Sequence, residues 1–188
     1  MKILAIVGSP RPEGNSSYVV DIALEEAKKQ GIEVEKVMLI EKQIGWCRGH
    51  VECGSQQNCL HDPDDAVEVV EKLFSADGVL LASPVYMGNV SGIMKNFMDR
   101  TRFKGRLDLK MPARSLGLIV VASNSGIEDT LAILERYVAR RCGIPPEKIH
   151  KVGGKARDPG EAQANQELIR QARELGQKMA EELKQTAS

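Results

Sequence analysis

The sequence predicts an α/β fold in which helices cover both faces of a central parallel sheet. Stretches with strand and helix character alternate from one end of the chain to the other, a pattern typical of parallel sheets. Three strand-like stretches are almost entirely apolar, at residues 3–7, 79–82 and 116–122. Strands of this composition lie where helices shield them on both sides. We therefore expect these three to be the central strands.

Two further strands complete the expected sheet. Residues 33–40 mix charged and apolar residues, as expected near an edge, and residues 148–152 form a short last strand. Helices are expected over residues 16–30, 64–74, 91–103, 128–141 and 161–185. The last has apolar residues three and four positions apart, which predicts one helix lying on the sheet. Residues 42–63 show no periodicity and form a long loop of the kind that is functional or mobile.

Size and charge limit the classes of function. The chain has 188 residues, so we expect residues 1–188 to form a single domain. Lys plus Arg and Asp plus Glu number 26 each, and this zero net charge argues against a nucleic-acid partner. The apolar run at 3–7 is too short for a signal peptide, and no segment is long enough to cross a membrane. We expect a cytoplasmic protein with no membrane partner.

A polar loop follows the first apolar strand. Its sequence, G-S-P-R-P-E-G-N-S-S from Gly8 to Ser17, joins a glycine-containing turn to a helix start, where backbone amides and the helix dipole bind phosphate. Asn15 replaces the lysine of the nucleoside-triphosphate loop, and the dinucleotide fingerprint G-x-G-x-x-G is missing. The loop therefore favours a single phosphomonoester. A turn that merely caps the helix is the alternative.

A second loop, S-P-V-Y-M-G-N from Ser83 to Asn89, follows the strand at 79–82. The carboxyl ends of parallel strands form one edge of the sheet, where ligands bind, so we expect the two loops to share a site. Pro84 ends the strand, and Gly88 lets the backbone approach a planar ligand. A phosphate site beside a surface for a flat ring indicates flavin mononucleotide (FMN).

The two loops together resemble those of the NAD(P)H-dependent FMN reductases. The resemblance rests on G-S-P-R-x-x-G-N-S-S followed by S-P-V-Y-M-G-N-V-S-G-I-M-K-N-F-M-D-R and extends over most of the chain. It implies a three-layer flavodoxin-like fold, with a five-stranded parallel sheet in the order 2-1-3-4-5 and FMN at its carboxyl edge. It also implies a homodimer or homotetramer.

The resemblance assigns individual residues to the flavin. The FMN phosphate would be held by Ser9, Arg11, Asn15, Ser16 and Ser17. The isoalloxazine would face Pro84, Val85, Tyr86, Met87, Gly88 and Asn89. A third loop would reach the other end of the ring through Ser123, Asn124 and Gly126, and a simple helix cap is its alternative. The chemistry belongs to the flavin, so no catalytic side chain is required, and Tyr86 is the only one we would test.

Three of the four cysteines lie in the loop at 42–63. Cys47, His50, Cys53 and Cys59 fall within thirteen residues, and their spacing resembles the cysteine motif of the iron-sulfur flavoproteins, a branch of the same family, with His50 in the second of four cysteine positions. Such a set suits a 4Fe-4S cluster or zinc, and surface thiols without metal are the alternative. His61 is a substitute ligand. Cys142 is expected to be an ordinary buried residue.

The predicted function is that of an FMN-dependent oxidoreductase that takes hydride from NAD(P)H and passes electrons to a small-molecule or protein acceptor. The alternative is a non-enzymatic electron-transfer flavoprotein that a protein partner reduces. A receiver domain would need an aspartate where Ser83 stands, and no cysteine has the arginine spacing of a small phosphatase. Residues 95–114 include seven basic and two acidic residues, an excess that suits either the phosphates of NADPH or a solvated helix face.

Overall fold

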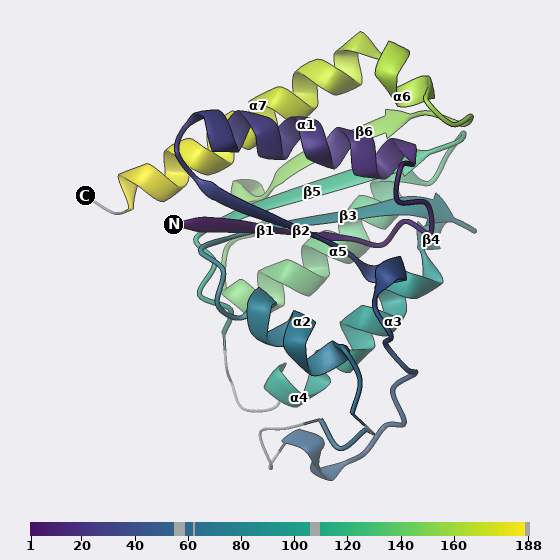
Figure 1. The fold of residues 1–188 in the computed structure, drawn as a ribbon, viewed down its shortest axis with the longest axis vertical. Coiled ribbons are helices and arrows are strands. Elements are labelled where there is room, and N and C mark those ends of the chain that lie inside the picture. Colours follow the sequence, from purple (N-terminus) through teal and green to yellow (C-terminus); the bar gives the residue numbers. More distant parts are fainter. Residues whose placement is uncertain (55–58, 62, 106–109, 187–188) are drawn as a thin grey trace.

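A five-stranded parallel sheet forms the centre of the computed structural model, which describes residues 1–54, 59–61, 63–105 and 110–186 (Figure 1). The strands follow the order β2 (Glu33–Met38), β1 (Lys2–Val7), β3 (Gly78–Tyr86), β5 (Ser115–Ala122) and β6 (His150–Lys155). With β5 and β6 counted as the fourth and fifth parallel strands, this confirms the predicted order 2-1-3-4-5. A two-residue strand, β4 (Asn89–Val90), pairs antiparallel with the end of β3.

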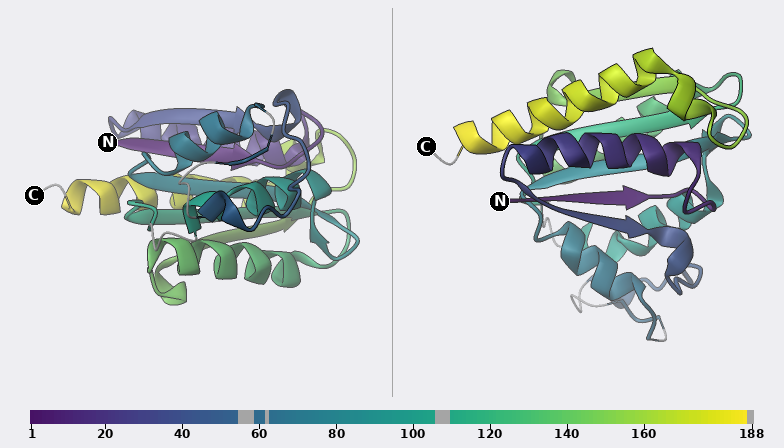
Figure 2. Two further views of the ribbon diagram at one scale, coloured as in Figure 1. Left: turned by 90° about the horizontal axis from the view of Figure 1, so that it is seen from below. Right: turned by 45° about the horizontal axis from the view of Figure 1, so that its top comes forward.

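Helices cover both faces of the sheet, which confirms the predicted three-layer α/β architecture (Figure 2). One face carries α1 (Asn15–Lys29), α6 (Glu161–Ala164) and α7 (Gln166–Gln185). The other carries α2 (Ala66–Leu73), α3 (Gly92–Arg100), α4 (Arg102–Gly105) and α5 (Ile127–Cys142). Three short 3₁₀ turns are η1 (Leu39–Glu41), η2 (Glu52–Gly54) and η3 (Pro146–Lys148). No helix of the described chain has the length and apolar character of a membrane span.

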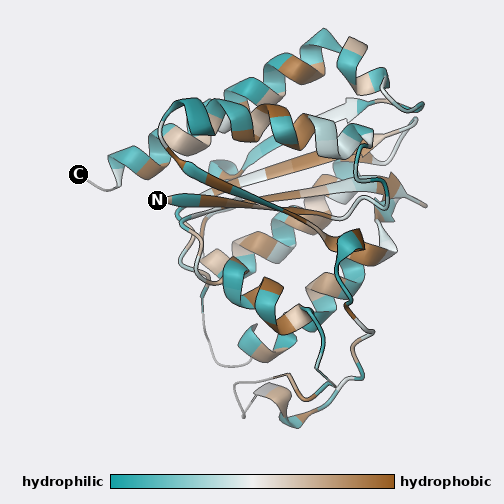
Figure 3. Ribbon diagram, viewed as in Figure 1, coloured by the Kyte–Doolittle hydropathy of each residue, from teal (hydrophilic) through white to brown (hydrophobic). Residues whose placement is uncertain are grey.

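The sheet divides the apolar interior into two cores. Successive side chains of a strand point to opposite faces, so Leu4 and Ile6 of β1 pack toward α2, α3 and α5, whereas Ile3, Ala5 and Val7 pack toward α1 and α7. All five side chains are buried. The central strands are accordingly hydrophobic along most of their length (Figure 3), as their composition predicted.

Two strands have different bounds from those expected. The strand expected over 33–40 ends at Met38, because Leu39–Glu41 turns as η1. The strand expected over 148–152 runs instead as β6 from His150 to Lys155. Pro146–Lys148 forms η3 before it, with proline in the first turn, where its fixed φ favours a helical start.

Two expected helices are each split in two. The helix expected over 91–103 ends at Arg100, where the Thr101 hydroxyl donates to the Met98 carbonyl at 2.7 Å and so competes with continuation of the helix. The helix expected over 161–185 breaks at Asn165. The Asn165 side chain accepts a hydrogen bond from the Leu168 amide at 3.0 Å and caps α7.

Candidate functional site

The loop between β1 and α1 folds around its own backbone. The buried Ser9 hydroxyl accepts a hydrogen bond from the Arg11 amide and donates to the Arg11 carbonyl, both at 3.1 Å. The Gly14 amide donates to the same carbonyl at 3.0 Å, and a Cβ on Gly14 would lie 2.9 Å from the Cβ of Arg11. No side chain of the described residues caps α1, so its first-turn amides are left to bind an anion.

The loop after β6 is held beside this phosphate loop. The side-chain nitrogen Nδ2 of Asn15 donates to the carbonyls of Ala156 at 3.2 Å and Asp158 at 2.9 Å. The Glu161 carboxylate accepts from the amides of Arg157 at 2.5 Å and Asp158 at 2.9 Å. These backbone hydrogen bonds lower the pKa of Glu161. The hydrogen bonds of Asn15 and Glu161 together hold this loop so that Arg157 lines the same cavity as Arg11.

A tight hairpin between β3 and β4 forms the second wall of the site. Its central residues, Met87 and Gly88, have φ values of 51° and 73°, as in the two-residue turns that suit a twisted hairpin. Met87 is fully exposed and Tyr86 is 45% exposed. Gly126 (φ 86°) packs behind the hairpin, where a Cβ would lie 2.9 Å from the Cγ1 of Val85. We call residues 83–89 the ring hairpin.

Two serines join the ring hairpin to the phosphate loop. The Ser83 hydroxyl donates to the Pro84 carbonyl at 2.8 Å and accepts from the Ser91 amide at 3.0 Å. The Ser91 hydroxyl caps α3 by accepting from the Met94 amide at 3.1 Å and donates to the Gly8 carbonyl at 2.5 Å. The two bonds that run between segments, Ser91 amide to Ser83 hydroxyl and Ser91 hydroxyl to Gly8 carbonyl, are both buried, and they connect the ring hairpin, the start of α3 and the phosphate loop.

A cavity of about 460 Å³ lies between these loops. Its lining comprises Ser9, Arg11, Gly14, Asn15, Ser16, Pro84, Val85, Tyr86, Met87, Val121, Ser123, Ala156 and Arg157. Two arginines face it, and no carboxylate is among the described residues along its wall. The helix start and the arginines make one part suited to an anion, while Pro84, Val85 and Val121 give an apolar surface for a flat ring.

Nine of the predicted cofactor residues line this cavity: Ser9, Arg11, Asn15, Ser16, Pro84, Val85, Tyr86, Met87 and Ser123. Ser17, Gly88, Asn89, Asn124 and Gly126 do not. The buried Ser17 hydroxyl instead accepts a hydrogen bond from the Lys36 ammonium group at 3.1 Å and contacts the Met38 sulfur at 3.8 Å. It therefore faces β2 and not the cavity.

Sequence reasoning missed Val121, Ala156 and Arg157, which also line the cavity. The rule that ligands bind beyond the carboxyl ends of the strands points to Ala156 and Arg157 once β6 is known to end at Lys155. Because the strand was expected to end at residue 152, Ala156 and Arg157 were not expected to adjoin its carboxyl end.

The predicted metal ligands differ in their burial and in their contacts. Cys47 is exposed, whereas Cys53 is buried and donates to the His50 carbonyl at 3.1 Å. The Cys59 sulfur accepts a hydrogen bond from the Arg100 guanidinium at 3.4 Å. Within the described residues no three His, Cys, Asp or Glu side chains gather as metal ligands. Their arrangement does not fit a metal here, so the 4Fe-4S or zinc site stays a prediction.

A buried ion pair connects the cysteine-containing loop to α3. Arg100 binds Asp64 through two hydrogen bonds of 2.5 and 3.0 Å and also donates to the Gly45 carbonyl at 2.8 Å. The two side chains are 1% and 11% exposed. Burial acts to raise the pKa of Asp64, but hydrogen bonds from Arg100 and from the amides of Ala66 and Gly45 outweigh it, and the pKa lies below its usual value.

Comparison with known proteins decides the family. The model for NADPH-dependent FMN reductases matches residues 1–142. The chain belongs to this family. It is 34% identical over 191 residues to an iron-sulfur flavoprotein of Methanocaldococcus jannaschii, with 98% of both chains covered. It is 38% identical over 182 residues to an iron-sulfur flavoprotein of Archaeoglobus fulgidus, which covers 96% of this chain and 80% of the relative.

Solved structures of flavoprotein reductases share the fold of this family member. An NAD(P)H:quinone oxidoreductase from Methanothermobacter marburgensis superposes with a TM-score of 0.75 at 14% identity, covering 95% of this chain and 96% of the other. An FMN-dependent NADH-azoreductase from Bacillus anthracis, solved with FMN, gives 0.70 at 16% identity, covering 96% and 100%. These similarities support the flavodoxin-like fold.

The cysteines are expected to differ in reactivity. Burial raises the pKa of the Cys142 thiol to about 12, so at pH 8 only about one thiol in ten thousand is the reactive thiolate. In metal-free protein treated with iodoacetamide at pH 8, mass spectrometry should find the exposed Cys47 modified first and Cys142 last. Labelling of Cys142 should accelerate as the pH rises. Equal rates at both cysteines would contradict this assignment.

Proposed function

We propose that this protein is an FMN-dependent oxidoreductase that takes hydride from NAD(P)H and passes electrons to a small-molecule or protein acceptor. The observation that carries the proposal is the 460 Å³ cavity, which places the start of α1 with Arg11 and Arg157 in the same site as the ring hairpin. Membership of the FMN reductase family supports the same assignment.

The residues present fit FMN. The phosphate would be held by the first-turn backbone amides of α1 and by the side chains of Arg11 and Arg157. A guanidinium group can donate two parallel hydrogen bonds to the oxygens of one phosphate. Pro84 and Val85 would lie against the isoalloxazine. Bound FMN would supply the hydride and electron chemistry, so the chain's own tasks are to bind, orient and expose the ring. The exposure of Tyr86 and Met87 leaves their side of the cavity open to an acceptor.

A specific observation supports a second candidate function. The two relatives described above are named iron-sulfur flavoproteins, and the chain has three cysteines with a spacing that resembles their cysteine motif, with His50 in the second of the four positions. An electron-transfer flavoprotein reduced by a protein partner would use the same FMN cavity. The two functions differ in whether a nicotinamide alone reduces the flavin.

Anaerobic absorption spectroscopy tests the proposal. Protein reconstituted with FMN should be yellow, and NADPH or NADH alone should bleach the flavin band within seconds. A protein that stays colourless after reconstitution would refute the flavin site. A yellow protein that dithionite bleaches and neither nicotinamide bleaches would favour the electron-transfer alternative.

Loss of either arginine should weaken the binding of FMN. A charge-assisted hydrogen bond is worth about 1.5–3 kcal/mol, so for these exposed side chains we expect Arg11→Ala and Arg157→Ala each to raise the Kd for FMN about tenfold, or about 1.4 kcal/mol. Quenching of flavin fluorescence on binding measures the Kd. Riboflavin is the matched control because it lacks the phosphate, and its affinity should not change. An equal loss for both ligands would show that the arginines act through folding.

A further inference from the structure

The loop that follows β6, at residues 156–160, forms part of the wall of the proposed flavin cavity. Two of its residues, Ala156 and Arg157, line that cavity. The loop starts at the edge of the sheet, where the Ala156 amide donates to the Ala122 carbonyl of β5 at 2.9 Å. We call residues 156–160 the β6 loop. Because two of its residues face the cavity, the contacts that hold this loop also shape the flavin site.

Asn15 holds the β6 loop with its whole side-chain amide. Its nitrogen Nδ2 donates to the carbonyls of Ala156 and Asp158, and its oxygen Oδ1 accepts from the Ala162 amide at 3.2 Å. An asparagine side chain has two N–H donors, so the two carbonyls use both of them. A bound phosphate could receive a hydrogen bond from this side chain only if a bond to the loop were broken.

Glu161 holds the β6 loop from the start of α6. Its carboxylate accepts hydrogen bonds from the main-chain amides of Arg157 and Asp158, and its own amide donates to the Asp158 carbonyl at 3.1 Å. The amides of Asp158 and Arg157 lower the pKa of the Glu161 carboxyl, and the charge on Arg157 adds to this effect. Glu161 is exposed and does not line the cavity. Its bonds go to the main chain of the loop, while Arg157 faces the cavity.

A carboxylate close to a phosphate site would by its charge alone weaken the binding of an anion, because like charges repel. Glu161 is such a carboxylate, since it bonds to the main chain of a residue that lines the cavity. Its two hydrogen bonds to the β6 loop give it the opposite effect, because they fix the position of Arg157. The two effects on FMN binding differ in sign and can be separated by experiment.

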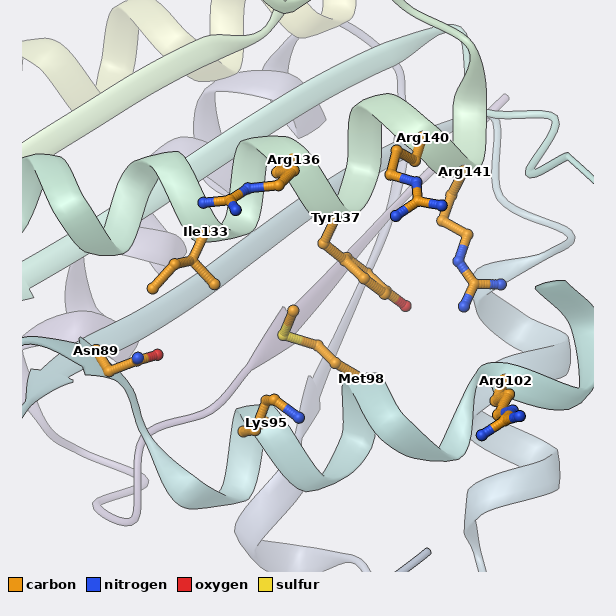
Figure 4. Close-up of a pocket in the computed structure, with 9 residues that line it drawn as sticks. All are labelled: Asn89, Lys95, Met98, Arg102, Ile133, Arg136, Tyr137, Arg140 and Arg141. Carbon is orange, nitrogen blue, oxygen red and sulfur yellow. The ribbon is translucent and has the colours of Figure 1, made fainter. Parts of the chain in front are cut away.

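The β6 loop supplies one of the two arginines along the described wall of the flavin cavity, and the other is Arg11. A separate cavity of about 540 Å³, between α3 and α5, is lined by four more: Arg102, Arg136, Arg140 and Arg141 (Figure 4). The two cavities share no lining residue among those described. The cationic side chains at the phosphate are therefore Arg11 and the arginine that the β6 loop brings there.

We propose that the β6 loop is a clamp on the flavin phosphate, and that Asn15 and Glu161 are the positioning residues that determine how tightly it holds FMN. The proposal rests on the proposed function, because it requires FMN in the cavity. Neither side chain contacts the phosphate. If either is removed, Arg157 is no longer fixed at the phosphate, and FMN is held there by the start of α1 and Arg11 alone.

The clamp predicts that removal of a negative charge weakens the binding of an anion. Glu161→Ala should raise the Kd for FMN about three- to tenfold, the effect of losing a hydrogen bond. The Kd for riboflavin, which lacks the phosphate, should not change. Charge repulsion alone predicts the opposite result, tighter binding of FMN. Quenching of flavin fluorescence measures each Kd.

Two further variants control this result. Glu161→Gln removes the charge but keeps an acceptor oxygen, so it should bind FMN more tightly than Glu161→Ala does. Glu181→Ala removes an exposed carboxylate of α7, about 22 Å along the helix from Gln166 at 1.5 Å per residue. Because it is far from the β6 loop, this substitution should leave the Kd for FMN unchanged.

A double-mutant cycle tests whether both residues act through Arg157. In the Arg157→Ala background, adding Asn15→Ala or Glu161→Ala should raise the Kd for FMN by less than about twofold, because the clamp then has no arginine to position. An Asn15 side chain that bound the phosphate itself would weaken FMN binding equally in both backgrounds. Unchanged or tighter FMN binding by Glu161→Ala, or losses that add to that of Arg157→Ala, would overturn the proposal.

The same measurements separate the clamp from the proposed function. Wild-type protein that takes up no FMN would refute both. If the Kd values follow the predicted pattern but neither NADPH nor NADH reduces the bound flavin, the proposed function fails and the clamp stands. If a nicotinamide reduces the flavin and Glu161→Ala binds FMN as wild type does, the function stands and the clamp is refuted.

Discussion

Replacement of Arg100 by alanine is expected to lower the free energy of unfolding by about 3–5 kcal/mol, the usual cost of breaking a buried ion pair. The variant leaves the Asp64 carboxylate, only 11% exposed, without its cation. It also removes hydrogen bonds to the Gly45 carbonyl and the Cys59 sulfur, so the cysteine-containing loop is held to α3 by fewer hydrogen bonds, among them that of Asn96 to the Ile44 carbonyl at 2.9 Å. Denaturant unfolding monitored by circular dichroism measures the change.

Two further variants control this result. Lys95→Ala, on the same helix, removes an ion pair in which both side chains are about half exposed, and it should cost less than about 1 kcal/mol. Arg100→Met/Asp64→Asn removes both charges and should recover part of the loss. If Arg100→Ala costs no more than Lys95→Ala, the buried pair has no special role in stability.

The effect of Arg100→Ala should depend on pH. The pKa of Asp64 in the folded protein lies below its ordinary value of 3.8, so its carboxylate contributes stability above that value, and this contribution is lost as the pH falls through the folded-state pKa. The difference in stability between wild type and Arg100→Ala should therefore be largest near pH 7 and shrink below about pH 4. A difference that stays constant over this range would show that the charge on Asp64 is not involved.

Gly8→Ala should have the second largest effect, because it acts on the fold and the proposed flavin site together. The added Cβ would lie 2.6 Å from the Cβ of the fully buried Met94 and 3.0 Å from the Ser91 hydroxyl oxygen. α3 or the phosphate loop must therefore move, at a cost typical of overpacking, about 1–3 kcal/mol. We also expect weaker FMN binding, because the Ser91 hydroxyl holds the Gly8 carbonyl. Unfolding and FMN titrations measure the two effects.

Gly92→Ala is the matched control for this substitution. Gly92 is the first residue of α3, and apart from its chain neighbours and the backbone of its own helix no atom of the described residues lies within 4 Å of the position that its Cβ would take. The same change of residue should therefore be neutral or stabilise by up to about 1 kcal/mol, because alanine favours a helix. Equal losses of stability in Gly8→Ala and Gly92→Ala would rule out close packing as the cause.

The sequence predicted the fold and both main loops of the proposed site because these depend on local patterns. The apolar runs of β1, β3 and β5 identify buried strands by composition alone. Helix boundaries were less predictable. The capping side chain of Asn165 and the hydroxyl of Thr101 compete with the main-chain bonds of a continuous helix, and an apolar periodicity cannot reveal that competition.

The sequence was enough to place some residues at the edge of the sheet that holds the cavity, whereas the surroundings of others are set by the tertiary structure. Residues such as Arg11 and Pro84 adjoin a strand end, so the alternation of elements was enough to place them at one edge of the sheet. Ser17 lies in the same motif, yet its hydroxyl accepts a hydrogen bond from Lys36 on β2 and does not line the cavity. Arg157 reaches the cavity because Asn15 and Glu161 hold its loop. The hydrogen bond from Asn15 to the Asp158 carbonyl joins residues 143 positions apart, and a contact over such a distance in the chain leaves no periodic signal.

The sequence by itself determined the alternation of strands and helices along the chain and the positions of the loops after β1 and β3, because hydrophobic period and turn chemistry are properties of neighbouring residues. Only the tertiary structure decided which charged side chains are paired with a side chain of opposite charge. Arg100 and Arg102 are two positions apart in the sequence, but Arg100 is buried against Asp64, whereas Arg102 is exposed and lines a cavity beside α5. The difference arises because Arg100 ends α3 whereas Arg102 begins α4, and the packing of each helix sets the side on which its side chain lies.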